Sequence, residues 1–152
     1  MEQIPRITPK EAQYLIEIYR EFIEKENNDK SYYFGPTKLS KKFNVSKVTA
    51  YEIIKKLVIL GLLEKANRAG YKLSTYGVAV AKKLIRRHRI LETFFVETIK
   101  ENPDRICARI FGLEIYFDDD IIDKMCNYLN HPRECPHGKK IPRKKECCEK
   151  ML

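Results

Sequence analysis

The sequence predicts a mainly α protein that begins with a winged helix-turn-helix, three helices plus a two-stranded wing, and continues as a second helical domain. Apolar residues recur at helical spacing along most of the chain. Two short amphipathic runs flank a tight turn at residues 44–46, and two short strand-like runs before residue 74 flank a basic turn. These three patterns together predict that fold class.

The first helix is predicted to begin after Thr8, which supplies a hydroxyl cap. Pro9 suits the first helical position, and Glu11 can reach back to the cap. Apolar residues continue at helical spacing: Leu15, Ile18, Tyr19, Phe22 and Ile23. The polar run NNDKS at 27–31 is predicted to end the helix.

The helix-turn-helix follows at residues 37–65. Leu39 and Phe43 mark a short bracing helix, the turn comes next, and Gly61 ends a second helix. The predicted buried stripe of this second helix is Val48, Tyr51, Ile54, Leu57 and Val58. In this layout the second helix can lie in the major groove of DNA.

The wing is predicted as two short strands joined by a turn at Arg68 to Gly70. A long helix then runs from a cap at Ser74 to about Ile99, and two further helices cover about 104–115 and 118–129. The predicted domains are therefore 1–74, 75–130, and a basic tail rich in Pro and Cys at 131–152.

The charge balance favours a polyanionic partner, because 30 Lys and Arg stand against 21 Asp and Glu, for a net charge of +9. The predicted DNA-binding residues are Ser46, Lys47, Thr49, Tyr51, Glu52, Lys55, Lys56, Arg68 and Lys72. Lysine pairs also serve simply to solvate a helix face, and that interpretation is preferred for Lys41 and Lys42.

The N-terminus has no apolar leader region, and no apolar run is long enough to span a membrane, so a cytoplasmic protein is expected. In a reducing compartment, five cysteines favour ligands or redox groups over a disulfide framework. Cys135 and His137 lack a third orienting group, and no Gly-rich phosphate loop is present, so no enzyme is expected.

Several ordered motifs carry a family resemblance: TPKEAQYLIEIY, LSKKFNVSKVTAYEIIKKLVILGLLEK with GYKLSTYG, RRHRILETFF, LEIYFDDDIIDKM and HPRECPHGKKIP. Over roughly residues 5 to 142 the chain resembles the diphtheria-toxin-repressor/manganese-repressor family of metal-dependent transcriptional regulators. The resemblance implies a helical dimerisation domain after the wing, a homodimer on a double-stranded DNA operator, and a repressor responsive to iron, manganese or zinc. An SH3-like third domain is not expected, since the sequence ends at residue 152.

The resemblance also implies a regulatory metal site that includes Gln13, where relatives offer Met or Asp, and Glu114. The chain departs from the family pattern at two further positions of that site. Phe111 stands where a Cys or Glu is expected, and Ile115 stands where relatives place a histidine. A carboxylate and an amide without imidazole or thiolate predict weak binding of a transition metal.

A neighbouring family site falls on His88, Glu92 and Cys107, where relatives carry a histidine at the last position. His88 and Glu92 are four residues apart and share a helix face. The mixed donor set suits zinc or iron(II) better than manganese. The alternatives are a hydrogen-bonded His/Glu pair at the surface and a small buried residue at Cys107.

The C-terminal cysteines leave two interpretations open. A metal ion or iron-sulfur cluster is one, with these candidate ligands: Cys126, Cys135, His137, Cys147 and Cys148. Free thiols in a flexible basic tail are the other. An alternative function therefore keeps the DNA-binding head but replaces the divalent-metal switch with an iron-sulfur or thiol redox sensor.

Overall fold

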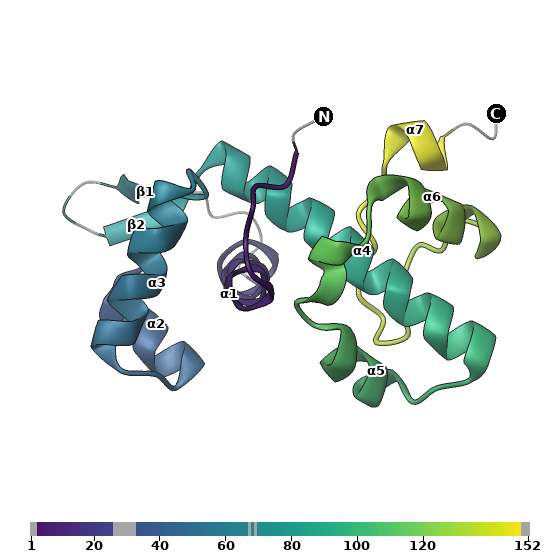
Figure 1. Cartoon of the computed structure of the whole chain (residues 1–152), viewed down its shortest axis with the longest axis horizontal. Coiled ribbons are helices and arrows are strands. Elements are labelled where there is room, and N and C mark those ends of the chain that lie inside the picture. Colours follow the sequence, from purple (N-terminus) through teal and green to yellow (C-terminus); the bar gives the residue numbers. More distant parts are fainter. Residues whose placement is uncertain (1–2, 26–32, 67, 69, 150–152) are drawn as a thin grey trace. The chain divides into compact units, whose positions relative to one another are not determined.

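The computed structural model describes residues 3–25, 33–66, 68 and 70–149 (Figure 1). Contacts between residues divide the chain into two compact units, Met1–Ala81 and Lys82–Leu152. The division falls within the long helix α4 (Thr75–Ile99), and each unit is described by itself. Among the described residues, no helix combines the length and the apolar character that crossing a bilayer requires.

The first unit opens with α1 (Pro9–Tyr19), which continues as one turn of π-helix, η1 (Arg20–Glu24). The predicted start is confirmed. The Thr8 backbone N–H donates to Glu11 Oε2 at 3.0 Å, and the Glu11 backbone N–H donates to Thr8 Oγ1 at 3.2 Å. This reciprocal capping box satisfies two of the free amides of the first turn. The NNDKS run lies outside the described residues.

The helix-turn-helix consists of α2 (Pro36–Phe43) and α3 (Lys47–Ile59). Asn44 ends α2 in the left-handed region with φ of 52°, a conformation that Asn tolerates better than most residues. Ala50, Ile54 and Leu57 are fully buried. They follow one another at i, i+4 and i+7, which makes them the core-facing stripe of α3.

The predicted stripe of α3 was partly wrong. Val48 is 72% exposed and Tyr51 is 51% exposed, whereas Val58 is half-buried. Since Ala50 turns inward, the side chains on either side of it in the first turn must turn outward. The helical period was right, and the phase of the stripe was set by tertiary packing.

The wing is an antiparallel pair of β1 (Leu63–Ala66) and β2 (Gly70–Leu73), in the register Leu63↔Leu73. Phe34 extends the sheet, since its backbone N–H donates to the Tyr71 carbonyl at 2.9 Å. Of the predicted turn, Arg68 is exposed, and residue 69 lies outside the described residues.

The second unit contains the remainder of α4 with α5 (Pro103–Ile110), the 3-10 turn η3 (Leu113–Tyr116), α6 (Asp119–Tyr128) and α7 (Lys145–Cys148). The predicted helix over 104–115 is divided in two, because Gly112 takes a left-handed φ of 91°. The short α7 was not predicted.

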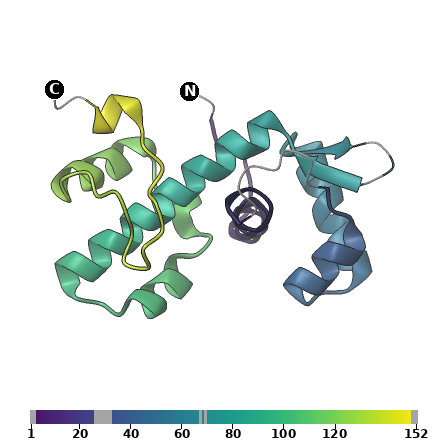
Figure 2. The same cartoon turned by 180° about the vertical axis from the view of Figure 1, so that it is seen from behind.

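The core of the second unit includes part of the segment expected to be a tail. Its buried members are Ile90, Leu91, Ile110, Ile122, Cys126, Cys135 and Ile141. Figures 1 and 2 show the segment after α6 running beside α4 before it reaches α7. Arg89 on α4 donates from Nη1 to the Lys140 carbonyl at 2.6 Å, which holds this segment to the helix.

The mainly α class with a winged helix-turn-helix is confirmed.

Candidate functional site

The exposed face of α3 carries a mixed polar, basic and aromatic surface. Its exposed members are Lys47, Val48, Thr49, Tyr51, Glu52, Lys55 and Lys56. Phosphate contacts need such cations, and base edges are read by hydroxyl, amide, carboxylate and methyl groups. Val48 was missed as a candidate because an apolar residue was assigned to the core.

Four of the predicted DNA-binding residues, Ser46, Thr49, Lys56 and Lys72, also have side-chain partners within the unit. The Ser46 side chain caps α3, since its Oγ accepts from the Thr49 backbone N–H at 3.0 Å. Lys56 Nζ lies 2.5 Å from Glu11 Oε1, and Lys72 Nζ lies 3.3 Å from Glu64 Oε1. Lys47 and Lys55 keep exposed side chains.

A buried group of possible metal ligands lies in the second unit. His88 and Glu92 come from consecutive turns of α4, and Cys107 comes from α5. One ligand atom from each lies within 4.8 Å of the others. His88 Nε2 is 3.2 Å from Cys107 Sγ and 3.9 Å from Glu92 Oε2. The structure therefore brings together the three residues of the second predicted site.

Glu114 joins this group through His88. Its Oε1 is 2.5 Å from His88 Nδ1, and its Oε2 accepts from the Gly112 backbone N–H at 2.7 Å. The left-handed Gly112 aims that N–H at the carboxylate. Because the Glu114 side chain is completely buried, these partners offset a large cost of desolvating the carboxylate.

His137 was predicted in the tail group but lies beside Glu92. Its Nδ1 forms a short ion pair with Glu92 Oε1, and its Nε2 is 2.7 Å from Asp104 Oδ1. Cys135 lies with the same pair, one ligand atom of each being within 4.8 Å of the others. Glu92 is thus shared by two neighbouring sets of donors. The sequence pattern gave no sign that Asp104 would contact His137, or that Glu92 would contact both His88 and His137.

The titration of His88 reflects its partners. Burial lowers the pKa of His88, but Cys107 and Glu114 outweigh burial and raise it to about 9. The pKa of His137 is raised as well, chiefly by Asp104 and against the effect of burial. A cation, whether a proton or a metal ion, is therefore favoured on these imidazoles or between them and the carboxylates.

The two family sites differ in how well these residues fit a metal. His88, Glu92 and Cys107 offer nitrogen, oxygen and sulfur donors in one buried place, which fits a divalent transition metal. At the other family position, Phe111 and Ile115 offer no donor, and Glu114 already has two partners. Gln13 lies on α1 in the first unit and is half-buried.

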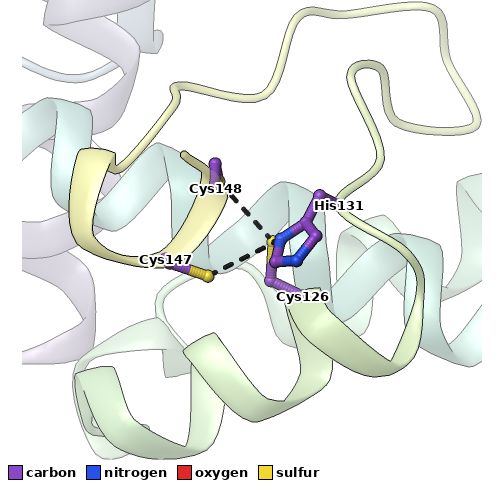
Figure 3. A group of neighbouring side chains, drawn as sticks. All are labelled: Cys126, His131, Cys147 and Cys148. Atoms are coloured by element: carbon purple, nitrogen blue, oxygen red, sulfur yellow. Dashed lines mark hydrogen bonds between the residues drawn. The ribbon is translucent and has the colours of Figure 1, made fainter. Parts of the chain in front are cut away.

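The remaining cysteines gather at the end of the chain in a group that we call the α6–α7 cluster: Cys126, His131, Cys147 and Cys148 (Figure 3). Three of the predicted tail ligands are present, whereas Cys135 and His137 lie in the Glu92 group. His131 was not predicted. A signal existed, because His131 follows Cys126 by five residues, just beyond the end of α6.

The chain has relatives among known proteins. Residues 74–143 match the family model described as "Iron dependent repressor, metal binding and dimerisation domain". The iron-dependent repressor IdeR of Mycobacterium leprae is 26% identical over 105 residues, 69% of this chain and 46% of that protein. An HTH-type transcriptional regulator of Methanocaldococcus jannaschii is 30% identical over 112 residues, 74% of this chain and 86% of that protein.

Solved structures agree with these relatives. The manganese regulator SloR has a TM-score of 0.72 and 31% identity, over 90% of this chain and 61% of SloR. The chain spans about half the length, 46%, of the IdeR relatives that it matches. Sequence similarity and the winged helix-turn-helix agree, and the chain belongs to the diphtheria-toxin-repressor/manganese-repressor family.

Proposed function

We propose that the chain is a sequence-specific DNA-binding transcriptional regulator that represses genes from a double-stranded operator as a homodimer. The observation that carries this proposal is the exposed first half of α3 in a winged helix-turn-helix, where only Ala50 faces the core. A recognition helix needs such outward-facing side chains near its N-terminus.

The basic, hydroxyl and apolar side chains on the exposed face of α3 would each contact a different part of DNA. Lys47 and Lys55 are exposed cations that suit phosphates. Thr49 and Val48 carry methyl groups, which suit the thymine methyl in the major groove, and the Thr49 hydroxyl suits base edges. The net charge of +9 favours association with DNA overall.

Operator selection followed by binding titrations tests this function. Affinity for the selected duplex should fall steeply with salt, since each neutralised phosphate releases a counterion. Thr49→Ala should weaken operator binding by about 1–3 kcal/mol and random DNA much less. Lys124→Ala, an exposed residue on α6, is the matched control and should change neither. Equal loss on both duplexes would remove Thr49 from base reading.

A homodimer is supported by exposed apolar side chains on the second unit. Tyr116 is 70% exposed and Tyr128 is 72% exposed, with Leu113 and Ile121 also exposed on η3 and α6. Aromatic residues in such positions are typical anchors of an interface.

The proposed regulatory ion is a divalent transition metal held by His88, Glu92 and Cys107. Bound there, the ion would supply positive charge that links α4 to α5 within the second unit. The support is the convergence of three different donor types at one buried place, and this mixture favours zinc or iron(II) over manganese.

Metal titration of the DNA complex tests this regulation. Cys107→Ser should reduce the metal-dependent gain in operator affinity at least tenfold, because a hydroxyl is a poor ligand for a soft ion. Arg105→Ala on the same helix, with its side chain 66% exposed, should leave that gain unchanged. His88→Ala should abolish the gain. A normal metal response in Cys107→Ser and His88→Ala would show that this group is not the switch.

A further inference from the structure

We propose that the α6–α7 cluster, Cys126, His131, Cys147 and Cys148, is a binding site for one zinc ion that fastens α7 to α6. Figure 3 shows the side chains of Cys147 and Cys148 facing Cys126 and the His131 ring. The site lies apart from His88, Glu92 and Cys107 and does not depend on the proposed DNA-binding function.

The distances within the cluster match a single tetrahedral ion. Cys126 Sγ is 3.9 Å from Cys148 Sγ and 3.4 Å from His131 Nδ1, and Cys147 Sγ is 3.8 Å from the same nitrogen. With Zn–S bonds of about 2.3 Å and Zn–N bonds of about 2.0 Å, the tetrahedron edges are about 3.8 Å between sulfurs and about 3.5 Å between sulfur and nitrogen. The observed separations therefore need little adjustment to receive the ion.

The two halves of the cluster are held together by residues that are not ligands. Arg143 Nη1 donates to the carbonyls of His131 at 3.1 Å and Pro132 at 3.2 Å. Lys144 Nζ lies 2.5 Å from Asp123 Oδ2 on α6. These contacts bring the start of α7 to α6 and place the four donors before an ion binds, which lowers the conformational cost of binding.

The backbone also aims His131 at the cluster. Asn130 and His131 both have left-handed backbones, with φ of 60° and 53°. The His131 backbone N–H donates to the Cys126 carbonyl at 2.8 Å, so the chain turns back over the last turn of α6. Two successive non-glycine residues in this region are uncommon, and such conformations concentrate at functional sites.

The charge beside the cluster fits a zinc ion with three thiolates, which has a net charge of about −1. Arg86 is only 6% exposed, and its Nη1 lies 2.9 Å from Asp123 Oδ1. Its Nε and Nη2 atoms are buried without a hydrogen-bond partner among the described residues.

Two other uses of these cysteines fit the structure less well. Packing as small apolar residues does not account for an imidazole and a buried guanidinium among the thiols. An iron-sulfur cluster binds its ligands on different irons, so it spreads the ligand atoms more widely than a single ion does. All four donor atoms here lie within 4.8 Å of one another.

An entry path is present as well. A surface pocket is lined by Asp123, Asn127, His131, Glu146 and Cys147, so two of the four ligands border solvent-accessible space. An ion can therefore reach the cluster without unfolding the unit, and binding displaces protons from the thiols.

The test uses the full chain, purified without added metal under reducing conditions, with cobalt(II) as a spectroscopic probe and zinc as competitor. Three thiolates should produce strong sulfur-to-cobalt charge transfer together with tetrahedral ligand-field bands, and one equivalent of zinc should bleach them. Cys147→Ser and Cys148→Ser should each weaken zinc binding at least tenfold, and both residues are only partly buried, so the fold should tolerate them.

Matched controls separate this site from the other donors. Cys107→Ser removes the thiol of the His88 group, so the charge-transfer bands that remain in this variant report the α6–α7 cluster alone. Cys135→Ser in the same background removes a buried thiol outside the cluster and should leave those bands unchanged. Three-thiolate bands that persist when Cys147→Ser or Cys148→Ser is added to Cys107→Ser, acid-labile sulfide in the purified protein, or a Cys126–Cys148 disulfide in place of metal would each overturn the proposal.

Hydrogen exchange supplies a readout that DNA binding does not affect. Zinc should slow exchange of the α7 amides in the parent protein and not in Cys148→Ser. If operator binding fails but this protection is seen, the zinc site stands without the proposed function. If the protection is absent while operator binding is normal, only the zinc site falls.

Discussion

Ser46 lies beside the proposed DNA-binding surface of α3 and has a structural role in the helix. It was predicted as a DNA contact, and its Oγ caps α3 by accepting from Thr49 N–H at 3.0 Å. The same oxygen lies 2.9 Å from Thr49 Oγ1. The hydroxyl that begins the helix therefore also orients a neighbouring candidate for base reading.

The cap can be tested by two substitutions. Ser46→Ala should lower the free energy of unfolding by about 1 kcal/mol, because the amide loses its acceptor, whereas Ser46→Asn should retain most of it. Urea denaturation measures both. If operator affinity falls equally in the two variants while stability stays at the parent value, Ser46 acts through DNA and not through the cap.

Asp119 connects stability to pH. Burial raises the pKa of Asp119, but Lys83 and Arg87 outweigh it and hold the pKa below the usual 3.8. Arg87 Nη2 lies 2.9 Å from Asp119 Oδ1, and Lys83 Nζ lies 2.7 Å from Oδ2. A depressed folded-state pKa stabilises the protein above the unfolded pKa and loses that effect as the pH falls.

Asp119→Asn should therefore cost about 2 kcal/mol of unfolding free energy at pH 7, a typical value for hydrogen bonds to charged groups. The difference from the parent should shrink as the pH falls through 3.8 and below, where the parent carboxylate also becomes protonated. Denaturant titrations from pH 7 to pH 3 measure this trend. Asp120→Asn, whose side chain is 75% exposed, is the control and should have little effect at any pH. A constant difference for Asp119→Asn would contradict the assignment.

At the scale of elements, the first turn of α4 packs directly on the residue before the wing. A Cβ on Gly77 would lie 1.9 Å from the Leu62 carbonyl oxygen, so only glycine fits there without movement. Ser74 Oγ reinforces the junction by donating to the Gly61 carbonyl at 2.5 Å. The position of the wing strands relative to α4 in the first unit therefore depends on a close backbone approach.

Gly77→Ala should destabilise the first unit by about 1–3 kcal/mol, the usual range for an overpacked site, although alanine is the better helix former. Thermal unfolding provides the measurement. Gly35→Ala is the steric control, since a Cβ there meets nothing within 4 Å, and it should cost no more than the loss of a glycine N-cap on α2. An unchanged or raised melting temperature in Gly77→Ala would mean that α4 can shift without cost.

At the scale of the whole molecule, the exposed aromatic side chains of the second unit concern the oligomeric state. Tyr116→Asp should raise the dissociation constant of the proposed homodimer at least tenfold, because the substitution would place a charge in the proposed apolar interface. Sedimentation equilibrium measures the constant, and Arg105→Ala on α5, with its side chain 66% exposed, should leave it unchanged. A dissociation constant equal to the parent value would exclude Tyr116 from the interface.

Much of the fold could be predicted because its signals are local. The Thr8 capping box, the Asn44 turn and Gly61 each depend on neighbouring residues, and helical spacing located α1 to α4. Predictions failed where distant packing decides. The phase of α3 placed Val48 outside instead of inside, and the left-handed Gly112 divided a helix that periodicity had joined.

The candidate sites divide in the same way. His88 and Glu92 could be paired from sequence because a helix places residues four apart on one face. That Glu92 also meets His137, and that His131 instead of Cys135 joins Cys147 and Cys148, depends on how the segment after α6 returns across the unit. The spacing of residues along the chain does not reveal how a later segment folds back onto an earlier helix.

The winged helix-turn-helix, the long helix α4 and the residue types suited to bind metal or DNA can be read from the sequence, because periodicity, capping and turn chemistry act over a few residues. The exposed face of α3, the division of the helix at Gly112 and the grouping of cysteines and histidines into sites required the folded structure. These outcomes depend on contacts between segments far apart along the chain, where burial and hydrogen bonding select one arrangement.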